Sequence, residues 1–241
     1  MTALLTLERV SKRFRGLTAV DNVSFAVPAG VIFAVIGPNG AGKTTLFNMI
    51  AGTLAPDGGA ITFAGNPIEG LSADAVCRRG IARTFQIVRP FPALTVEDNV
   101  TIGALLHRHD VGAARQRAQE LLRRLDLFDK RQRLASTLTL PDRKRLEVAR
   151  ALATGPQLLL LDEVMAGLRP TETDRMVAIL RELNRDSGLS ILLIEHVMRA
   201  VMALASHVLV LDHGVAIAEG APDAIVRDPA VVQSYLGAEA V

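Results

Sequence analysis

The eight residues 37–44 have the composition and spacing of a phosphate-binding loop. Their sequence, GPNGAGKT, fits the pattern G-x-x-x-x-G-K-[S/T] at every defined position. Glycines allow consecutive backbone N–H groups to wrap around phosphate oxygens, and the first turn of a following helix adds free N–H donors. The expected phosphate ligands are Gly37, Pro38, Asn39, Gly40, Ala41, Gly42, Lys43, Thr44 and Thr45.

Three side chains of this loop have separate expected roles. Lys43 should contact the β- and γ-phosphates, Thr44 should bind Mg²⁺, and Thr45 is placed to contact the α-phosphate. ATPases, GTPases and kinases share this pattern. The loop therefore predicts a nucleotide with Mg²⁺ and does not choose among those classes.

Three polar side chains follow directly on apolar segments of strand length. Residues 158–161 (LLLL) precede Asp162 and Glu163, and residues 192–195 (LLIE) precede His196. Ligands of α/β sheets lie beyond the carboxyl ends of the strands. We expect Asp162 to hold Mg²⁺, directly or through water, and Glu163 to polarise the attacking water. An imidazole at His196 could reach the γ-phosphate and the same water.

Apolar segments predict the elements that position these side chains. Continuous apolar runs, typical of strands buried on both faces, occur at 31–36, 157–161 and 189–194. Helical patterns occur at 42–51, 171–187 and 197–205. Because strands alternate with helices, the sequence predicts an α/β fold with a mainly parallel sheet, the core of a P-loop nucleotide hydrolase.

Other segments depart from that alternation. Residues 3–27 are rich in alternating Val, Leu and Phe, which predicts two short strands joined at Gly16 and an antiparallel β subdomain. Residues 95–153 have a helical pattern and are interpreted as an inserted α-helical subdomain. A strand at 81–86 and a hairpin at 208–218 are also expected.

Composition limits the class of protein. The 241 residues suit one domain, and a net charge of +2 gives no overall bias toward nucleic acid. Residues 108–150 are basic, which fits either a solvated helical face or a surface near anionic lipid or acidic partner loops. With one cysteine, no leader-like N-terminus and no apolar run of membrane-spanning length, we expect a soluble, cytoplasmic protein.

Taken together, the motifs resemble those of the ATP-binding-cassette ATPases of membrane transporters. The resemblance covers nearly the whole chain and is closest to the branched-chain amino acid importer type. It rests on GPNGAGKTTLFNMIAG, ARTFQ, RKRLEVARALA, LLLLDE, AGL-x-P, LLIEHVMRAVM and the ending EGAPDAIVRDP…SYLG. It implies a Mg²⁺-dependent ATPase that powers an importer from the cytoplasmic face of the plasma membrane.

The resemblance also implies a division of the chain and further site residues. One cassette, 1–241, would comprise a nucleotide-binding core with its β subdomain (1–86 and 154–220), a coupling loop with the helical subdomain (87–153) and a tail helix (221–241). Phe14 matches the aromatic residue that stacks on adenine, although a strand core residue is the plainer alternative. Gln86 matches the glutamine that senses Mg²⁺ and water.

The resemblance implies several partners. Such proteins work as head-to-tail dimers, with an identical or a different second ATPase subunit, and each ATP lies between the phosphate loop of one chain and the signature motif of the other. Residues 87–99, including Phe91, would contact a cytoplasmic helix of the transmembrane permease. A periplasmic or extracellular substrate-binding protein would be an indirect partner, and no nucleic acid partner is expected.

The signature motif departs from the family pattern. Where LSGGQ is usual, residues 138–142 read LTLPD, so both glycines and the glutamine are replaced. Thr139 could still offer a hydroxyl to the partner's ATP, Thr-x-x-Asp resembles a helix capping box, and Pro141 is tolerated in a first turn. The carboxylate of Asp142 is expected to repel the partner's γ-phosphate and to weaken that site. Alternatively, Thr139 and the backbone suffice.

Two smaller departures and two competing functions complete the prediction. Val164 replaces the proline that usually follows the catalytic glutamate, and Arg169 replaces an Asp or Asn in the next loop. A soluble cassette ATPase of DNA repair or translation is the first alternative, but the chain lacks the long coiled-coil insertion or tandem cassette usual there. A hydrolysis-impaired regulatory cassette is the second, and Glu163 and His196 argue against it.

Overall fold

The core of the molecule is a six-stranded sheet, and the phosphate-binding loop lies at the carboxyl end of one of its inner strands. The computed structural model describes residues 3–108 and 110–238. The strand order is β10-β9-β3-β8-β7-β6, and every neighbouring pair is parallel except β9 with β10. The strands are β3 (Ile32–Ile36), β6 (Ile81–Arg83), β7 (Leu158–Asp162), β8 (Ser190–Ile194), β9 (His207–Asp212) and β10 (Val215–Gly220). The predicted α/β fold with a mainly parallel sheet is confirmed.

Alternate residues of each central strand belong to two different hydrophobic cores. In β3, Phe33 and Val35 pack on one side with α1, and Ile32, Ala34 and Ile36 pack on the other side with the helices. Every residue of β3, β7 and β8 is buried. A strand covered on both faces needs apolar side chains at every position, which explains the continuous apolar runs.

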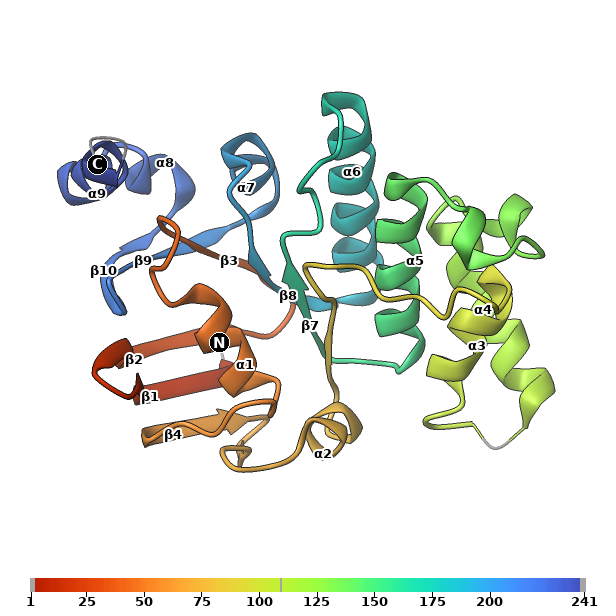
Figure 1. The fold of residues 1–241 in the computed structure, drawn as a ribbon, viewed down its shortest axis with the longest axis horizontal. Coiled ribbons are helices and arrows are strands. Elements are labelled where there is room, and N and C mark those ends of the chain that lie inside the picture. The colour runs from red at the N-terminus through yellow and green to blue at the C-terminus, as the bar shows by residue number, and fades with distance from the viewer. Residues whose placement is uncertain (1–2, 109, 239–241) are drawn as a thin grey trace.

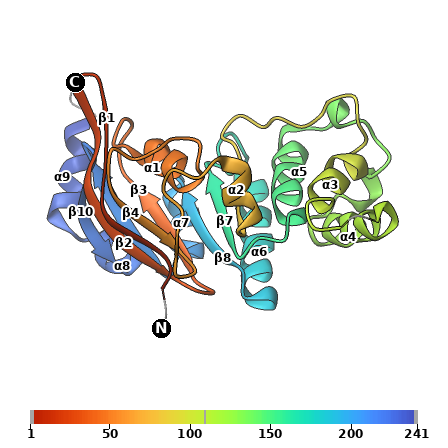
Figure 2. The same cartoon turned by 90° about the horizontal axis from the view of Figure 1, so that it is seen from below.

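A second sheet lies on the face of the core sheet that also holds α1 (Lys43–Ile50). It is antiparallel with the order β2-β1-β4-β5. Its strands are β1 (Ala3–Phe14), β2 (Leu17–Pro28), β4 (Gly58–Phe63) and β5 (Asn66–Pro67). Figure 2 shows β1, β2 and β4 packed across α1 and the core strands. The predicted hairpin is correct but its strands are long, at 12 residues each, and β5 was not anticipated.

A block of helices lies at the end of the molecule opposite β10 and the last helices (Figures 1 and 2). It contains α3 (Val96–Ala104), α4 (Val111–Arg124), α5 (Leu140–Ala153) and the 3₁₀ turns η1 (Phe128–Lys130) and η2 (Ala135–Thr137). The remaining helices are α2 (Ala73–Arg78), α6 (Pro170–Ser187), α7 (Met198–Leu204), α8 (Pro222–Ile225) and α9 (Pro229–Ala238). Of these, α8 was not anticipated.

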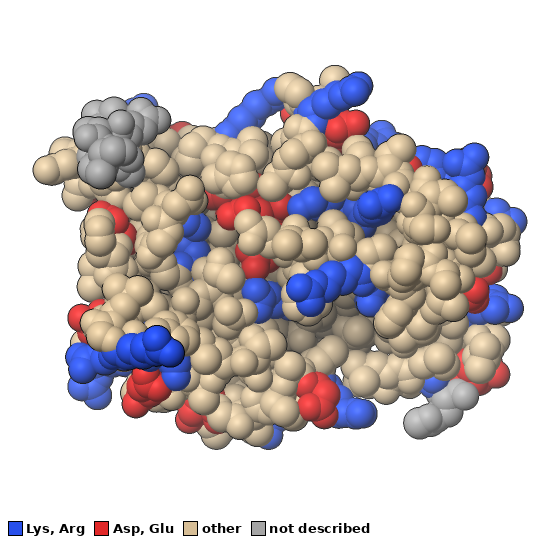
Figure 3. All heavy atoms as spheres, in the orientation of Figure 1, with Lys and Arg blue, Asp and Glu red and all other residues tan. Residues whose placement is uncertain are grey.

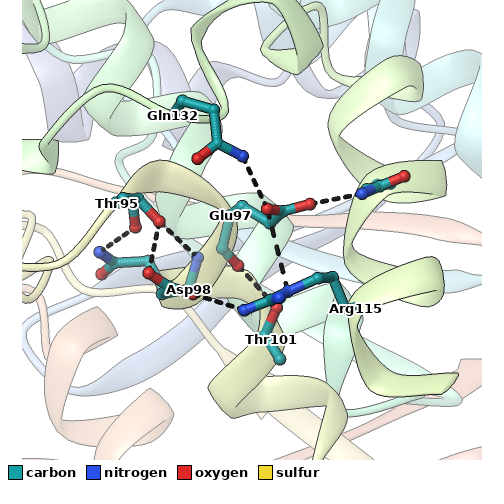
Figure 4. Close-up of polar contacts among 8 residues, drawn as sticks. Thr95, Glu97, Asp98, Thr101, Arg115 and Gln132 are labelled. Atoms are coloured by element: carbon teal, nitrogen blue, oxygen red, sulfur yellow. Dashed lines mark hydrogen bonds and ion pairs between the residues drawn. The ribbon is translucent and has the colours of Figure 1, made fainter. Parts of the chain in front are cut away.

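A buried carboxylate joins the parts of this helical block (Figure 4). Glu97 of α3 is 5% exposed and accepts hydrogen bonds from Gln119 of α4, at 2.6 Å, and from Gln132, at 3.0 Å. Arg115 Nε lies 3.9 Å from the same carboxylate. Charge-assisted bonds to a buried acceptor are among the stronger polar contacts in proteins. Glu97 therefore fixes α3 against α4 and the segment before η2.

The Glu97→Ala substitution is expected to lower the free energy of unfolding by about 2–3 kcal/mol, because it leaves the two amides and the guanidinium without their shared acceptor. The measurement is urea unfolding followed by circular dichroism. Glu120→Ala is the control, since the Glu120 side chain is 60% exposed and pairs with Arg117 at the surface. Equal stability losses in the two variants would contradict this role of Glu97.

Candidate functional site

The loop between β3 and α1 has a backbone that only glycine can form at two positions. Gly37 and Gly42 have φ values of 147° and 100°. A Cβ at Gly37 would stand 2.0 Å from the carbonyl oxygen of Leu211, and one at Gly42 would stand 2.2 Å from that of Ala19. The glycines of the motif therefore serve the packing of the loop against β9 and β2 as well as access to its N–H groups.

Lys43 is the cation of the loop. It is 8% exposed, and its ammonium donates to the carbonyls of Gly37 and Pro38, both at 2.8 Å. Burial lowers the pKa of Lys43, and the negative charges of Glu163 and Asp162 oppose that shift. The two predicted acids thus favour the charged form of this buried lysine, which suits a ligand of phosphate oxygens.

A cavity of about 440 Å³ brings most of the predicted site residues together. Residues 39–45 form one wall, and Phe14, Gln86, Glu163 and His213 contribute to the others. Phe14 ends β1 with a side chain that is 45% exposed, so the alternative of a strand core residue is excluded. The volume lies within the range of small-molecule sites.

Gln86 and His196 converge on one oxygen of Glu163. Gln86 Nε2 donates to Glu163 Oε2 at 2.7 Å, and His196 Nδ1 lies 3.9 Å from the same atom. Glu163 adopts a left-handed backbone conformation, with φ at 49°, which costs a non-glycine residue about 1–2 kcal/mol. Its N–H donates to the carbonyl of Ile194, so the strained residue is tied to β8. Such strain at a polar cluster is characteristic of functional sites.

Gln86 itself lies outside the strand predicted for it. β6 ends at Arg83, so Gln86 belongs to the loop that follows the strand. It thereby obeys the rule that placed Asp162, Glu163 and His196 at the carboxyl ends of strands. The strand is thus three residues shorter than predicted, and Gln86 still lines the predicted site.

Asp162 is buried behind the cavity with one oxygen unpaired. The residue is 1% exposed, and Oδ2 accepts from Arg83 at 2.8 Å. Oδ1 has no hydrogen-bond partner within the described part of the chain. A buried carboxylate oxygen with no donor fits a ligand of Mg²⁺ or of its water, and the hydroxyl of Thr44 fits as a second oxygen ligand. In residues 3–108 and 110–238 no three His, Cys, Asp or Glu side chains cluster as a metal site.

Three residues near this site were not predicted. His213 follows β9 at the same edge of the sheet and lines the cavity, so the strand-end rule that selected His196 would have found it. Arg83 and Lys144 reach the site through contacts that no sequence pattern reveals. Arg83 bonds Asn48 as well as Asp162, and Lys144 reaches Glu163 from α5.

Glu195 is a second buried carboxyl behind Glu163. It is 1% exposed, and its Oε1 accepts from the N–H of Met165 at 2.9 Å. Burial raises the pKa of Glu195 to about 7, and the nearby charge of Glu163 adds to the shift. Glu195 therefore changes charge near neutral pH.

The Glu195→Gln substitution is expected to stabilise the protein increasingly as pH rises from 5 to 8. The pKa of Glu195 is higher in the folded protein than the ordinary value of 4.5, so folding loses stability as pH rises through this window. Glutamine does not ionise, and its advantage should reach roughly 3 kcal/mol at pH 8. Urea unfolding across the pH range measures it, with Glu182→Gln at an exposed position of α6 as the control. A pH-independent difference from wild type would refute the buried titration.

The signature segment lies outside this cavity, at the start of α5. Thr139 is the N-cap residue and is exposed, and Pro141 lies in the first turn. The expected capping box is not formed, because Thr139 Oγ1 donates to the side chain of Asp142, at 2.9 Å, and caps no backbone N–H. Thr139 therefore lies outside the ATP cavity of its own chain, as an exposed residue whose hydroxyl donates its proton to Asp142.

The structure gives no support to the expected repulsion by Asp142. Asp142 is 3% exposed, and its carboxylate accepts from Lys130 and Arg145, each at 2.5 Å. Burial raises the pKa of Asp142, but the bonds from Lys130, Thr139 and Arg145 outweigh it and hold that pKa below its ordinary value. The negative charge is compensated within the helical block and does not face outward.

Ion pairs account for much of the basic segment at 108–150. Arg115 pairs with Asp98, Arg124 with Asp186 and Arg150 with Glu147. Figure 3 shows Lys and Arg side chains across the middle of one face, interspersed with Asp and Glu. These contacts favour the interpretation as a solvated face with internal pairs. Over the described ranges, no helix is long and apolar enough to span a bilayer.

A phosphate loop and strand-end acids on this two-sheet fold define a nucleotide hydrolase of the P-loop class. The chain belongs to the ABC transporter family, whose family model matches residues 20–166. Members of this family bind and hydrolyse ATP. A second model, described as a branched-chain amino acid ATP-binding cassette transporter, matches residues 217–241.

Individual relatives span the whole chain. The high-affinity branched-chain amino acid transport ATP-binding protein LivG of Escherichia coli is 39% identical, with 97% of this chain and 98% of LivG covered. The lipopolysaccharide export system ATP-binding protein LptB of Escherichia coli is 37% identical, with 98% of each chain covered. The ADP conformation of MJ1267, an ATP-binding cassette of an ABC transporter, superimposes with a TM-score of 0.89 at 31% identity and covers 98% of this chain and 100% of its own.

Proposed function

We propose that this chain is the Mg²⁺-dependent ATPase subunit of a membrane importer for branched-chain or related amino acids. The observation that carries the proposal is the convergence of Gln86 and His196 on Glu163, beside the phosphate loop. An acid that one amide holds by a hydrogen bond and an imidazole approaches, at one end of a nucleotide cavity, suits the activation of water.

The proposed roles follow from the positions of the residues. Residues 37–45 bind the phosphates and Phe14 stacks on adenine. Thr44, Asp162 and Gln86 hold Mg²⁺, which supplies positive charge to the phosphate oxygens. Glu163 accepts a proton from the attacking water, and Gln86 and His196 orient that water and Glu163.

The proposed site is completed by a second ATPase subunit. Thr139 at the start of α5 lies away from its own cavity and is exposed, which suits contact with ATP bound to a partner in a head-to-tail dimer. The proposal holds for an identical or a different second subunit. The compensated charge of Asp142 supports the alternative in which Thr139 and the backbone suffice for that contact.

A groove beside the helical block is the proposed docking site for the permease. It has a volume of about 280 Å³ and is lined by Phe85, Phe91 and Ile102, whose apolar side chains are 43–46% exposed. Asn99 is fully buried and bonds both the N–H and the carbonyl of Phe91, which fixes the segment that presents this ring. Exposed apolar side chains in a preformed groove suit a helix of the permease, with the chain peripheral on the cytoplasmic face of the membrane.

The proposed division of the chain follows from these surfaces. Residues 1–86 and 154–220 carry the nucleotide, residues 87–153 carry the permease contact and the signature segment, and residues 221–241 form the tail. The Glu97 contacts join α3, α4 and the segment before η2, which supports treating 87–153 as a unit, and the apolar cluster of α3, α4 and α5 continues into β3, β7 and β8 of the core.

Import rather than export is supported by the match of the C-terminal segment to branched-chain amino acid cassettes and by the identity to LivG. The 37% identity to LptB makes an export complex the second candidate. Co-purification with the membrane partners, followed by uptake of radiolabelled leucine into vesicles that hold the complex and a substrate-binding protein, tests the proposal. ATP- and Mg²⁺-dependent uptake is expected, and a complex that moves only lipid outward would overturn the import assignment.

A further inference from the structure

A buried lysine of α5 holds the backbone of two proposed site residues. Lys144 is 4% exposed, and its ammonium donates to the carbonyl of Glu163 at 2.9 Å and to that of Gln86 at 3.3 Å. The three residues come from separate segments of the chain. One cation therefore joins α5 to the loops that follow β6 and β7.

The contact with Glu163 falls where the backbone is strained. Glu163 has a left-handed conformation, and its N–H is already bound to the carbonyl of Ile194. Its carbonyl accepts from Lys144 at 2.9 Å and from the N–H of Ala166 at 3.2 Å, so both polar backbone groups of the residue are held and Lys144 is the charged donor among their partners. A charge-assisted bond to a carbonyl is stronger than a neutral one. Together these bonds stabilise the conformation that aims the Glu163 side chain.

The carboxylates around Lys144 favour the charged form of its side chain, although the side chain is buried. Burial lowers the pKa of Lys144, while the charges of Glu195, Glu163, Asp162 and Glu147 oppose that shift. The ammonium takes its hydrogen bonds from the Gln86 and Glu163 carbonyls, whereas these four carboxylates act at longer range. The close partners of this buried cation are the carbonyls of two site residues. It is therefore better suited to orienting the backbone of those residues than to forming an ion pair.

We infer that Lys144 is a positioning residue for ATP hydrolysis. It fixes the backbone of Glu163 and Gln86, so the two side chains meet at the 2.7 Å separation at which Gln86 bonds Glu163. Because Thr139 and Lys144 share α5, the same lysine ties the surface that reaches the partner subunit to the acid of its own chain. The inference rests on the proposed function, with Glu163 as the residue that activates water.

The test compares Lys144→Met, which keeps the aliphatic stem and removes the donors, with Arg117→Met, on the surface of α4. ATP turnover of the full chain in its complex, the KM for ATP and the melting temperature are measured for each. Misplacing a catalytic group by about 1 Å can cost about 10²-fold in rate. We expect kcat of Lys144→Met to fall 10- to 100-fold with KM within about twofold, and Arg117→Met to keep both values.

A second variant keeps the test informative if Lys144→Met does not fold. Lys144→Arg retains the buried charge, but a planar guanidinium cannot place its donors as the compact ammonium does, so a loss of kcat of at least about threefold at unchanged KM is expected. Folded Lys144→Arg with full turnover, or folded Lys144→Met within twofold of wild type, would overturn the inference. Wild-type protein without ATPase activity, or Glu163→Gln with undiminished activity, would instead refute the proposed function.

Discussion

Glu163→Gln is expected to reduce ATP turnover by at least about 10²-fold, the range in which general bases contribute, while ATP affinity changes little. Glutamine has nearly the shape of glutamate and can still accept the bond from Gln86 at Glu163 Oε2, so the geometry of the cavity should persist. It cannot take a proton from water. Steady-state phosphate release and equilibrium binding of a fluorescent ATP analogue measure the two effects separately.

The same variant should accumulate as an ATP-bound dimer, because binding continues while the step that ends the bound state is blocked. Light scattering after gel filtration in Mg-ATP measures the mass. Glu219→Gln is the matched control, since Glu219 pairs with His207 at the surface and lies outside the cavity. Wild-type turnover in the Glu163 variant would remove Glu163 from its proposed role.

Asp142→Asn is expected to lower the free energy of unfolding by about 2–4 kcal/mol, because it removes a buried anion from between two cations. The side chains of Lys130 and Arg145 are 35% and 17% exposed, so water recovers part of the loss. Urea unfolding measures the change. Asp129→Asn, at an exposed position of η1, should change stability by less than about 0.5 kcal/mol.

An unchanged stability in Asp142→Asn would show that the ion pairs contribute nothing net. The expected loss also affects attempts to restore the usual signature motif. A variant that restores the signature motif by replacing Asp142 would also break the contacts of Lys130 and Arg145. A change in its turnover could then come from the new motif or from the lost ion pairs. Glycines at 140 and 141 with Asp142 retained would isolate the effect on the partner's ATP.

Much of the site could be predicted from sequence because its chemistry is local. The phosphate loop is a continuous segment between a strand and a helix, Asp162 is the last residue of β7, and His196 lies two residues beyond the end of β8. Phe14 and Gln86 needed the family resemblance, since a lone aromatic residue or amide carries no pattern of its own. In the structure, both residues line the same cavity as the phosphate-binding loop.

The contacts that escaped prediction are tertiary. Lys144 reads as one cation among many in a basic segment, and only packing of α5 against the core sheet aims it at the Glu163 carbonyl. Asp142 was expected to face outward because a helix N-terminus suggests an exposed ligand site. Its burial depends on Lys130, which approaches from a separate turn. The short elements β5 and α8 lacked the length that a periodic pattern requires.

The central position of β3 has a consequence for how the chain is made. Residues 32–36 are synthesised early, yet they pair with residues 191–194 on one side and 207–210 on the other. At ordinary translation rates the strand waits on the order of ten seconds for both neighbours. During that time an apolar strand with two open edges can join another nascent chain. We expect this stretch to be the segment that chaperones must shield, and the native sheet to form late and slowly.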